Sequence, residues 1–173
     1  MIKKAFFFLF LLVFFACLAV YWQFSQALHS KLLFNDGNKT HLLTVKSGSS
    51  ISSFSKQLES KGWISDRFWL RNYGRLFPQQ ANIKAGTYNI DIDTSVLELL
   101  TQVVQGKEHQ FTVTFIEGTR FSDALIAMQS HPYIERQTSN KTLTQIAETI
   151  GITNIIEGNP EGWLFPDTYA FTA

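Results

Sequence analysis

Apolar residues form one unbroken run near the N-terminus. Residues 5–22 carry no charged or strongly polar side chain, and after Lys4 the next charge is Lys31. A helix rises about 1.5 Å per residue, so this run is long enough to cross the hydrocarbon core of a membrane. Two lysines precede the run and a Tyr-Trp pair ends it, as at a membrane interface. The pattern predicts a cytoplasmic N-terminus, with the rest of the chain on the opposite side of the membrane.

Two other kinds of segment share this position in a chain. A cleaved signal peptide has a shorter apolar core and a small-x-small cleavage site. A lipoprotein signal needs small residues directly before its cysteine, but a bulky Phe15 stands two residues before Cys17. We favour an uncleaved anchor, with a cytoplasmic tip and transmembrane helix at residues 1–28 that contacts the membrane through residues 5–24. Cys17 is then an apolar filler, and residues 29–40 are a linker that lifts the folded part off the membrane.

Strand-like and helix-like patterns follow the linker in a regular order. Residues 41–46 have strand composition and run into a Ser-Gly turn. Ser49 or Ser50 can cap a helix that ends at Gly62, because a serine hydroxyl accepts an unpaired backbone N–H. A second helix starts near residue 65 and ends before Gly74, and residues 84–90 form a strand. The expected order is strand, helix, helix, strand.

A second set of elements echoes the first. A helix at 96–105 and a half-buried strand at 110–116 lead to helices at 121–128 and 143–150. The motif Thr44-Val45-x-x-Gly48 recurs 70 residues later as Thr114-Phe115-x-x-Gly118. Both copies predict a strand that enters a glycine turn and then an amphipathic helix. We therefore expect an α+β fold with two related units.

Composition excludes several classes of function. The net charge is +1, and no Lys/Arg cluster marks a surface for nucleic acid. The four histidines are not at metal-ligand spacing, and the single cysteine cannot form an intramolecular disulfide. The sequence also lacks a Gly-x-Ser-x-Gly elbow, a phosphate-binding glycine loop and a His-Glu-x-x-His motif. We predict no metal, no cofactor and no nucleic-acid partner.

Carboxylates beside aromatic residues are the chemistry that remains. Residues 161–169, Glu-Gly-Trp-Leu-Phe-Pro-Asp-Thr-Tyr, combine two acids with three aromatic residues. Sugar rings have apolar faces that stack on aromatic rings and hydroxyls that hydrogen-bond to acids. A glutamic acid with a raised pKa can also protonate a glycosidic oxygen. We interpret this stretch as one wall of a carbohydrate-binding cleft, and the acids to consider are Glu117, Glu157, Glu161 and Asp167.

Glu117 and Arg120, in the turn of the second copy, leave two alternatives open. They can form a solvated ion pair at a helix start, which contributes little to stability. Alternatively, they line the same cleft as Glu161. The candidate substrate-binding residues are therefore Glu117, Arg120, Glu161, Trp163, Phe165, Asp167 and Tyr169.

The first copy resembles a LysM module, which is a peptidoglycan-binding βααβ unit. Residues 44–54 resemble the opening of that module, and Ala85-Gly86-Thr87-Tyr88-Asn89-Ile90 resembles its closing strand. A position that is usually acidic is Ser49 here, and the second helix departs from the pattern. A small packing module without glycan affinity is the alternative, because a shared fold does not transfer function. We assign residues 41–106 to a LysM-like subdomain with its following helix.

The whole chain resembles the endolytic murein transglycosylase family of bacterial inner membranes. The resemblance rests on residues 161–169 and on Phe115-Ile116-Glu117-Gly118, preceded in the same order by the anchor and the LysM-like unit. It implies a lyase that cleaves nascent peptidoglycan strands without water. One glutamate acts as acid on the bond after N-acetylmuramic acid, then as base on that sugar's 6-hydroxyl, which leaves a 1,6-anhydro end. It also implies a single-pass inner-membrane protein with a periplasmic C-terminal part, acting on glycan strands beside cell-wall synthesis proteins.

The catalytic glutamate of that family follows the Pro-Asp-Thr-Tyr motif in a helical segment, whereas only residues 170–173 follow the motif here. No carboxylate of the chain matches that position, so we assign no catalytic residue and expect the glutamate beyond Ala173. Residues 107–173 are then the beginning of a catalytic domain that is cut short, and the 173-residue chain alone is expected to be inactive. Two other functions remain: a non-catalytic membrane-anchored peptidoglycan-binding or scaffold module, and a structural partner of the envelope-synthesis machinery.

Overall fold

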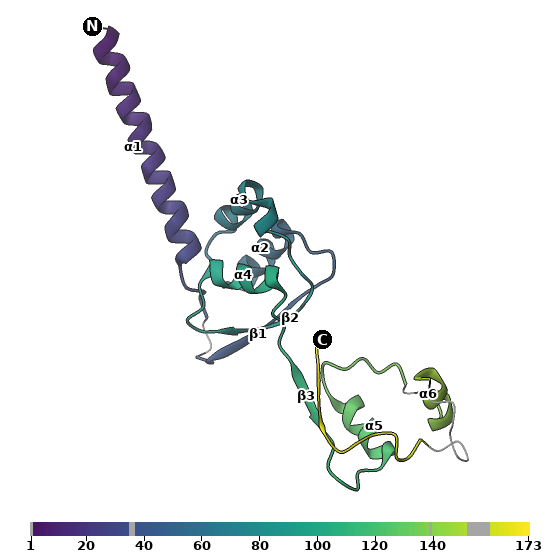
Figure 1. The fold of residues 1–173 in the computed structure, drawn as a ribbon. Coiled ribbons are helices and arrows are strands. Elements are labelled where there is room, and N and C mark those ends of the chain that lie inside the picture. Colours follow the sequence, from purple (N-terminus) through teal and green to yellow (C-terminus); the bar gives the residue numbers. More distant parts are fainter. Residues whose placement is uncertain (1, 35–36, 139, 152–159) are drawn as a thin grey trace. The chain divides into compact units, whose positions relative to one another are not determined.

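The computed structural model describes residues 2–34, 37–138, 140–151 and 160–173. It has a mixed α and β fold with a long apolar helix at the N-terminus and two small sheets (Figure 1). Its internal contacts divide the chain into two units, Met1–His109 and Gln110–Ala173. The boundaries expected after residues 28, 40 and 106 stay predictions.

In the part of the chain that the structure describes, each unit contains a strand, two helices and a second strand in that order. The first unit contains α1 (Ile2–His29), β1 (Thr40–Val45), α2 (Ile51–Ser60), α3 (Phe68–Leu76), the short 3₁₀ helix η1 (Pro78–Gln80), β2 (Gly86–Asp91) and α4 (Val96–Gln105). The second contains β3 (Phe111–Thr114), α5 (Phe121–Ser130), α6 (Leu143–Thr149) and β4 (Thr168–Phe171).

The apolar run forms α1, which continues beyond the run and packs on the first unit. From Lys3 to His29 the helix is long and apolar enough to cross a membrane by length and composition, and its most apolar window is not buried in the protein. Its last turns are different. The Phe24 ring lies 6.0 Å from the Trp69 ring and 6.2 Å from the Tyr73 ring, and Leu28 is buried in the core. The helix is therefore tied to α3 at its C-terminal end.

The segment after α1 also packs on this unit, whereas residues 29–40 were expected to be a spacer. Leu32 is buried in the core, and its N–H donates to the carbonyl of Thr94 at 3.0 Å. Lys31 forms an exposed ion pair with Asp93 at 2.6 Å. The reason is hydrophobic, because a free spacer would leave the Leu32 side chain in water. The expected turn at residues 35–38 lies partly outside the described residues.

β1 and β2 form an antiparallel sheet that runs from Thr40 opposite Asp91 to Val45 opposite Gly86. Side chains alternate between the two faces of a strand, so one face carries the apolar residues. That face packs with α2 and α4 into one core, whose fully or nearly fully buried members include Leu43, Val45, Phe54, Leu58, Tyr88, Ile90, Leu99, Leu100 and Val103. The expected order of strand, helix, helix and strand is present, and the LysM-like identity of the unit stays a prediction.

Gly74 lies inside α3, not at its end as the sequence suggests. A Cβ atom at this position would lie 2.7 Å from both Cγ atoms of Ile51, the first residue of α2. Glycine in a helix interior costs about 1 kcal/mol relative to alanine. Here it allows α2 and α3 to approach closely, so tertiary packing outweighs the local preference and the helix continues to Leu76.

β3 and β4 form the sheet of the second unit, with Phe111 opposite Phe171 and Thr114 opposite Thr168. β3, α5 and α6 lie within or close to the ranges expected from the sequence. β4 was not expected. Its four residues are too few for a periodic pattern, and its partner strand lies far away in the sequence.

The two units repeat the same local structure, as the recurring sequence motif predicts. The hydroxyls of Thr44 and Thr87 lie 3.1 Å apart across the first sheet, and those of Thr114 and Thr168 lie 2.9 Å apart across the second. Both turns contain a glycine with positive φ and the same backbone hydrogen bond. Each closing strand then has a tyrosine whose hydroxyl donates to a carbonyl four residues earlier: Tyr88 to Lys84 and Tyr169 to Phe165, both at 3.0 Å.

The close approach at Gly74 gives a stability prediction. Gly74→Ala should lower the free energy of unfolding by about 1 kcal/mol, because the cost of overpacking against Ile51 exceeds the gain in helix propensity. Thermal unfolding of the detergent-solubilised chain, followed by circular dichroism, measures the change. In an Ile51→Ala background the same substitution should be neutral or stabilising. A higher melting temperature for Gly74→Ala alone would contradict this account.

Candidate functional site

Glu161 binds the N-terminus of α5. The backbone N–H of Phe121, the first residue of α5, donates to both carboxylate oxygens of Glu161, at 3.0 and 3.1 Å. The first N–H groups of a helix have no partner within it, and the helix dipole favours an anion there. The preceding residue, Arg120, makes no side-chain capping bond, whereas its counterpart Ser50 caps α2 with its own hydroxyl. Glu161 thus supplies from 40 residues away the cap that the local sequence lacks.

Asp167 also has a structural role. Its Oδ1 accepts the backbone N–H of Thr168 at 2.7 Å, and its carbonyl accepts the N–H of Phe115 at 2.9 Å. The second bond extends the pairing between β3 and β4 by one residue, and the first fixes the Asp167 side chain at the start of β4. The two acids of the motif therefore hold the chain in place through bonds to backbone N–H groups.

The aromatic residues of the motif point outward to different degrees. Trp163 is 51% exposed and Phe165 is 72% exposed. Tyr169 is held by its bond to Phe165, and its ring lies 5.5 Å from the ring of the buried Phe115. The motif therefore presents two large aromatic side chains to solvent on a segment that hydrogen bonds fix at Glu161, Asp167 and Tyr169.

Glu117 and Arg120 are both exposed in the turn before α5. The ion pair that the sequence left as one alternative does not form: no salt bridge joins these two side chains, both of which belong to the described part of the chain. The cap brings Glu161 to the residue after Arg120. Their role in binding substrate stays a prediction. Glu157 lies outside the described residues.

A groove of about 560 Å³ lies beside β3 and β4, and Tyr169 is the one candidate residue in its described lining. The lining is largely apolar and includes Val113, Phe115, Met128, Ile134, Leu164 and Phe171. By the repeat, most of these residues match buried core residues of the first unit, including Leu43, Val45, Leu58, Ile64, Tyr88 and Ile90, which share a cluster with α4. The groove is therefore lined by the counterparts of residues that form the buried core of the first unit. Its apolar walls do not suit the hydroxyls of a glycan.

An aromatic cluster closes the end of the second sheet and was not identified from the sequence. The Phe111 ring stacks on Tyr133 at 4.3 Å, and His131 meets Phe171 edge-on at 4.9 Å. The 70-residue repeat relates Phe111 and Tyr133 to His41 and Trp63, and the rings of that pair also lie close together in the first unit, 5.8 Å apart. The cluster fixes the end of β4 and so the position of the motif before it.

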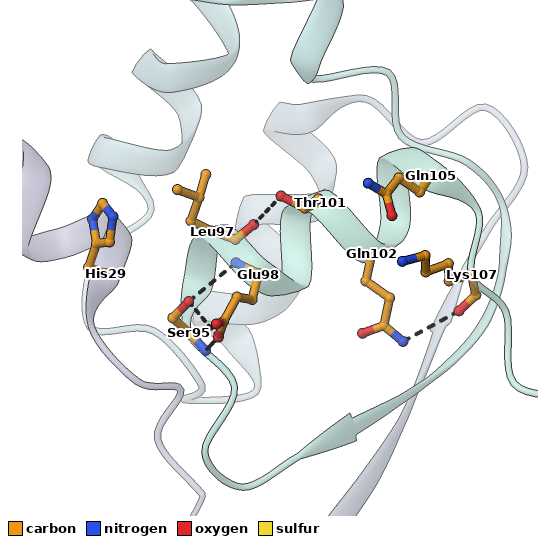
Figure 2. Close-up of a pocket in the computed structure, with 8 residues that line it drawn as sticks. All are labelled: His29, Ser95, Leu97, Glu98, Thr101, Gln102, Gln105 and Lys107. Carbon is orange, nitrogen blue, oxygen red and sulfur yellow. Dashed lines mark hydrogen bonds between the residues drawn. The ribbon is translucent and has the colours of Figure 1, made fainter.

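A polar hollow of about 500 Å³ runs along α4 in the first unit, and Figure 2 shows the residues that line it. Glu98 contributes the carboxylate among the described residues that line the hollow. Hydrogen bonds from the backbone and then the side chain of Ser95 lower the pKa of Glu98, with its N–H 2.8 Å and its hydroxyl 2.8 Å from Oε2. A carboxyl held ionised in this way is a helix cap and not a proton donor at neutral pH.

Together, the fold and the motif define a chain of two repeated strand–helix–helix–strand units, with exposed aromatics on a segment fixed by its own acids, after a helix suited to span a membrane. Comparison with known proteins places this chain in a family. It belongs to the YceG-like family, the endolytic murein transglycosylase family, which matches residues 43–173.

The crystal structure of a YceG-like protein from Listeria monocytogenes is among the similar solved structures. It shares 20% sequence identity with this chain, and the alignment covers 77% of this chain with a TM-score of 0.37. The chain spans 48% of the length of that structure. No curated protein matches the chain.

The capping role of Glu161 is testable by substitution. Glu161→Ala should destabilise the second unit by about 1 kcal/mol, because the first N–H of α5 loses its acceptor. Glu161→Gln keeps a neutral acceptor and should lose less. Hydrogen exchange at the amide of Phe121 in the intact chain measures the effect.

Glu117→Ala is the matched control for Glu161, since it removes an exposed acid from the turn before the same helix. Its amide protection at Phe121 should equal that of the wild type. Unchanged protection in Glu161→Ala would show that the carboxylate does not cap α5.

The cap at Glu98 gives a prediction about pH. A lowered pKa in the folded state means that the ionised carboxylate stabilises the fold above its ordinary pKa of about 4.5, and that this stabilisation is lost as the pH falls through the lower folded value. Wild type should therefore melt at a higher temperature than Glu98→Gln at neutral pH, and the difference should vanish in acid. A difference that stays constant from neutral pH to below pH 3 would contradict the assignment.

Proposed function

We propose that the chain is the membrane-anchored part of an endolytic peptidoglycan lytic transglycosylase and that residues 161–169 bind the glycan strand through Trp163 and Phe165. One observation carries the proposal. In a chain of this family, the acids of the motif are engaged with backbone N–H groups while its two aromatic residues are exposed.

Exposed aromatic rings on a fixed segment suit a polysaccharide. A pyranose ring has apolar C–H faces, which gain contact area on a flat aromatic side chain at small cost in side-chain entropy. Trp163 and Phe165 are two residues apart, and the bonds at Glu161 and Asp167 restrain the backbone on either side of them. We infer that these bonds reduce the ordering cost of binding a strand, with Glu117 and Arg120 as polar contacts at the same helix start.

The chemistry of the family needs one glutamate at a separate position. A carboxylic acid protonates the glycosidic oxygen after N-acetylmuramic acid as the bond from C1 breaks. The resulting carboxylate then takes the proton of the 6-hydroxyl, whose oxygen bonds to C1 and closes the 1,6-anhydro ring. Glu161 and Asp167 accept hydrogen bonds from backbone N–H groups, so both carboxylates are engaged in holding the fold. We propose that the catalytic glutamate belongs to a helical segment after the Pro-Asp-Thr-Tyr motif.

The anchor determines where this chemistry takes place. We propose that α1 spans the inner membrane with its two lysines in the cytoplasm, so that both folded units lie in the periplasm. Nascent glycan strands are made at that surface, and cell-wall synthesis proteins are the expected neighbours. A non-catalytic, membrane-anchored peptidoglycan-binding module is the alternative function.

Binding of glycan strands tests the proposed role of the aromatics. Trp163→Ala and Phe165→Ala should each weaken binding of uncross-linked glycan strands by about fivefold or more, because truncating an aromatic contact costs about 1 kcal/mol or more. Fluorescence titration of the detergent-solubilised chain with labelled strands measures the dissociation constant.

Ile126→Ala is the matched control, because Ile126 is 61% exposed in the same unit but lies outside the motif. Its affinity should equal that of the wild type. Equal affinities in all four proteins would overturn the glycan-binding role of the motif. The 173-residue chain is expected to release no 1,6-anhydro ends, and their release would contradict the placement of the catalytic glutamate.

A further inference from the structure

A groove of about 770 Å³ lies between α1 and α3 of the first unit. One face of α1, from Leu12 to Phe24, forms the first wall. The second wall is α3, which contributes Phe68, Trp69, Asn72, Arg75 and Leu76. Arg75 is the one charged side chain among the described residues that line the groove. Phe24 meets Trp69 edge-on and stacks on Tyr73, and these contacts fix the two helices at the base of the groove.

The surface of α3 around this groove is apolar as well. Phe68 is 50% exposed and Leu76 is 67% exposed, and Phe77 continues the same surface at 44%. Burial of apolar area stabilises by roughly 25 cal/mol per Å², so these side chains are costly to leave in water. Exposed apolar surface of this extent marks a contact with a partner or a membrane.

The first wall shows what covers the groove. Its residues from Leu12 to Tyr21 belong to the apolar run at 5–22. Under the proposed anchoring, lipid surrounds this run, and the groove opens into the same leaflet. From Leu12 to Tyr21 the helix rises about 14 Å, which is close to the hydrocarbon depth of one leaflet, about 15 Å.

We propose that α3 lies in the membrane interface and that the groove binds a phospholipid, with an acyl chain between α1 and α3 and its phosphate at Arg75. The proposal rests on the proposed anchoring of α1. Tryptophan and tyrosine favour the interface, where Trp69 and Tyr21 would both lie. The Arg75 guanidinium can donate paired hydrogen bonds to phosphate oxygens while its stem stays along the apolar wall. The first unit would then be held against the membrane.

Spin labels in the intact chain test this proposal in nanodiscs of phosphatidylethanolamine and phosphatidylglycerol. One nitroxide is attached to the native Cys17 in α1, and others through Leu76→Cys or Phe77→Cys in a Cys17→Ser background. A label through Leu42→Cys, on an exposed position of β1, is the matched control. Collision rates with oxygen, which concentrates in lipid, and with a nickel chelate, which stays in water, are compared at each site.

The proposal predicts that labels at 76 and 77 collide with oxygen in preference to the nickel chelate, as the label at Cys17 does and several-fold more than the label at 42. A water-like ratio at 76 and 77 with a lipid-like ratio at Cys17 would overturn it and leave the anchor intact. A water-like ratio at Cys17 would overturn the anchoring itself. An immobilised label that neither reagent reaches would show that a protein helix, such as one from a second copy, covers the groove.

Arg75→Glu tests the phosphate contact separately. The acidic side chain should repel the lipid phosphate and lower the oxygen preference of the label at 76, while Arg75→Lys should keep it. An oxygen preference that is unchanged in Arg75→Glu would remove Arg75 from the proposed site.

Discussion

The return of the last strand of each unit to its first strand is the constraint on which the rest of the structure depends. In the first unit, β2 comes back to β1 after two helices, and in the second β4 comes back to β3 across a longer interval. Closing such long loops costs conformational entropy, and contacts within each loop do not offset that cost. The same two contacts stabilise the pairing of the strands in both units. One is a threonine pair across the sheet, and the other is a tyrosine hydroxyl that donates to the carbonyl four residues before it. In the second unit, the bond between Glu161 and the N-terminus of α5 is a third contact that helps to bring β4 back to β3.

The need to bring β4 back to β3 explains why the acids and the aromatics of the motif have different roles. Glu161 accepts a hydrogen bond from the backbone of α5, and Asp167 accepts one from the backbone of β4. Both carboxylates therefore stabilise the closed second unit. Trp163 and Phe165 lie between these two fixed points and are exposed to solvent. The equivalent tyrosines of the two closing strands also differ in their surroundings. Tyr88 is fully buried in a core that includes α4, whereas Tyr169 is partly exposed beside a groove.

The sequence predicts the elements whose causes are local, and it misses those that depend on distant partners. Serine caps, glycine turns and the apolar stripes indicate α2, α4, α5 and both opening strands. Gly74 misleads, because its reason is the proximity of Ile51 and not a helix end. β4 and the Glu161 cap are missed for the same reason, since each is defined by a partner at least 40 residues away. The motif was recognised as a candidate site, but which of its side chains are free to bind required the hydrogen bonds of the folded chain.

The central claim is that the acids of the motif hold the fold while its aromatics contact glycan. The indole N–H signals of the four tryptophans test it most directly, in ¹H–¹⁵N spectra of the intact chain titrated with glycan strands. The account predicts that the Trp163 signal shifts on binding, that those of Trp22, Trp63 and Trp69 do not, and that the Phe121 amide keeps its position because Glu161 stays bound to it. A Trp163 signal that stays in place while strands bind, or a Phe121 amide that loses its protection, would contradict the account.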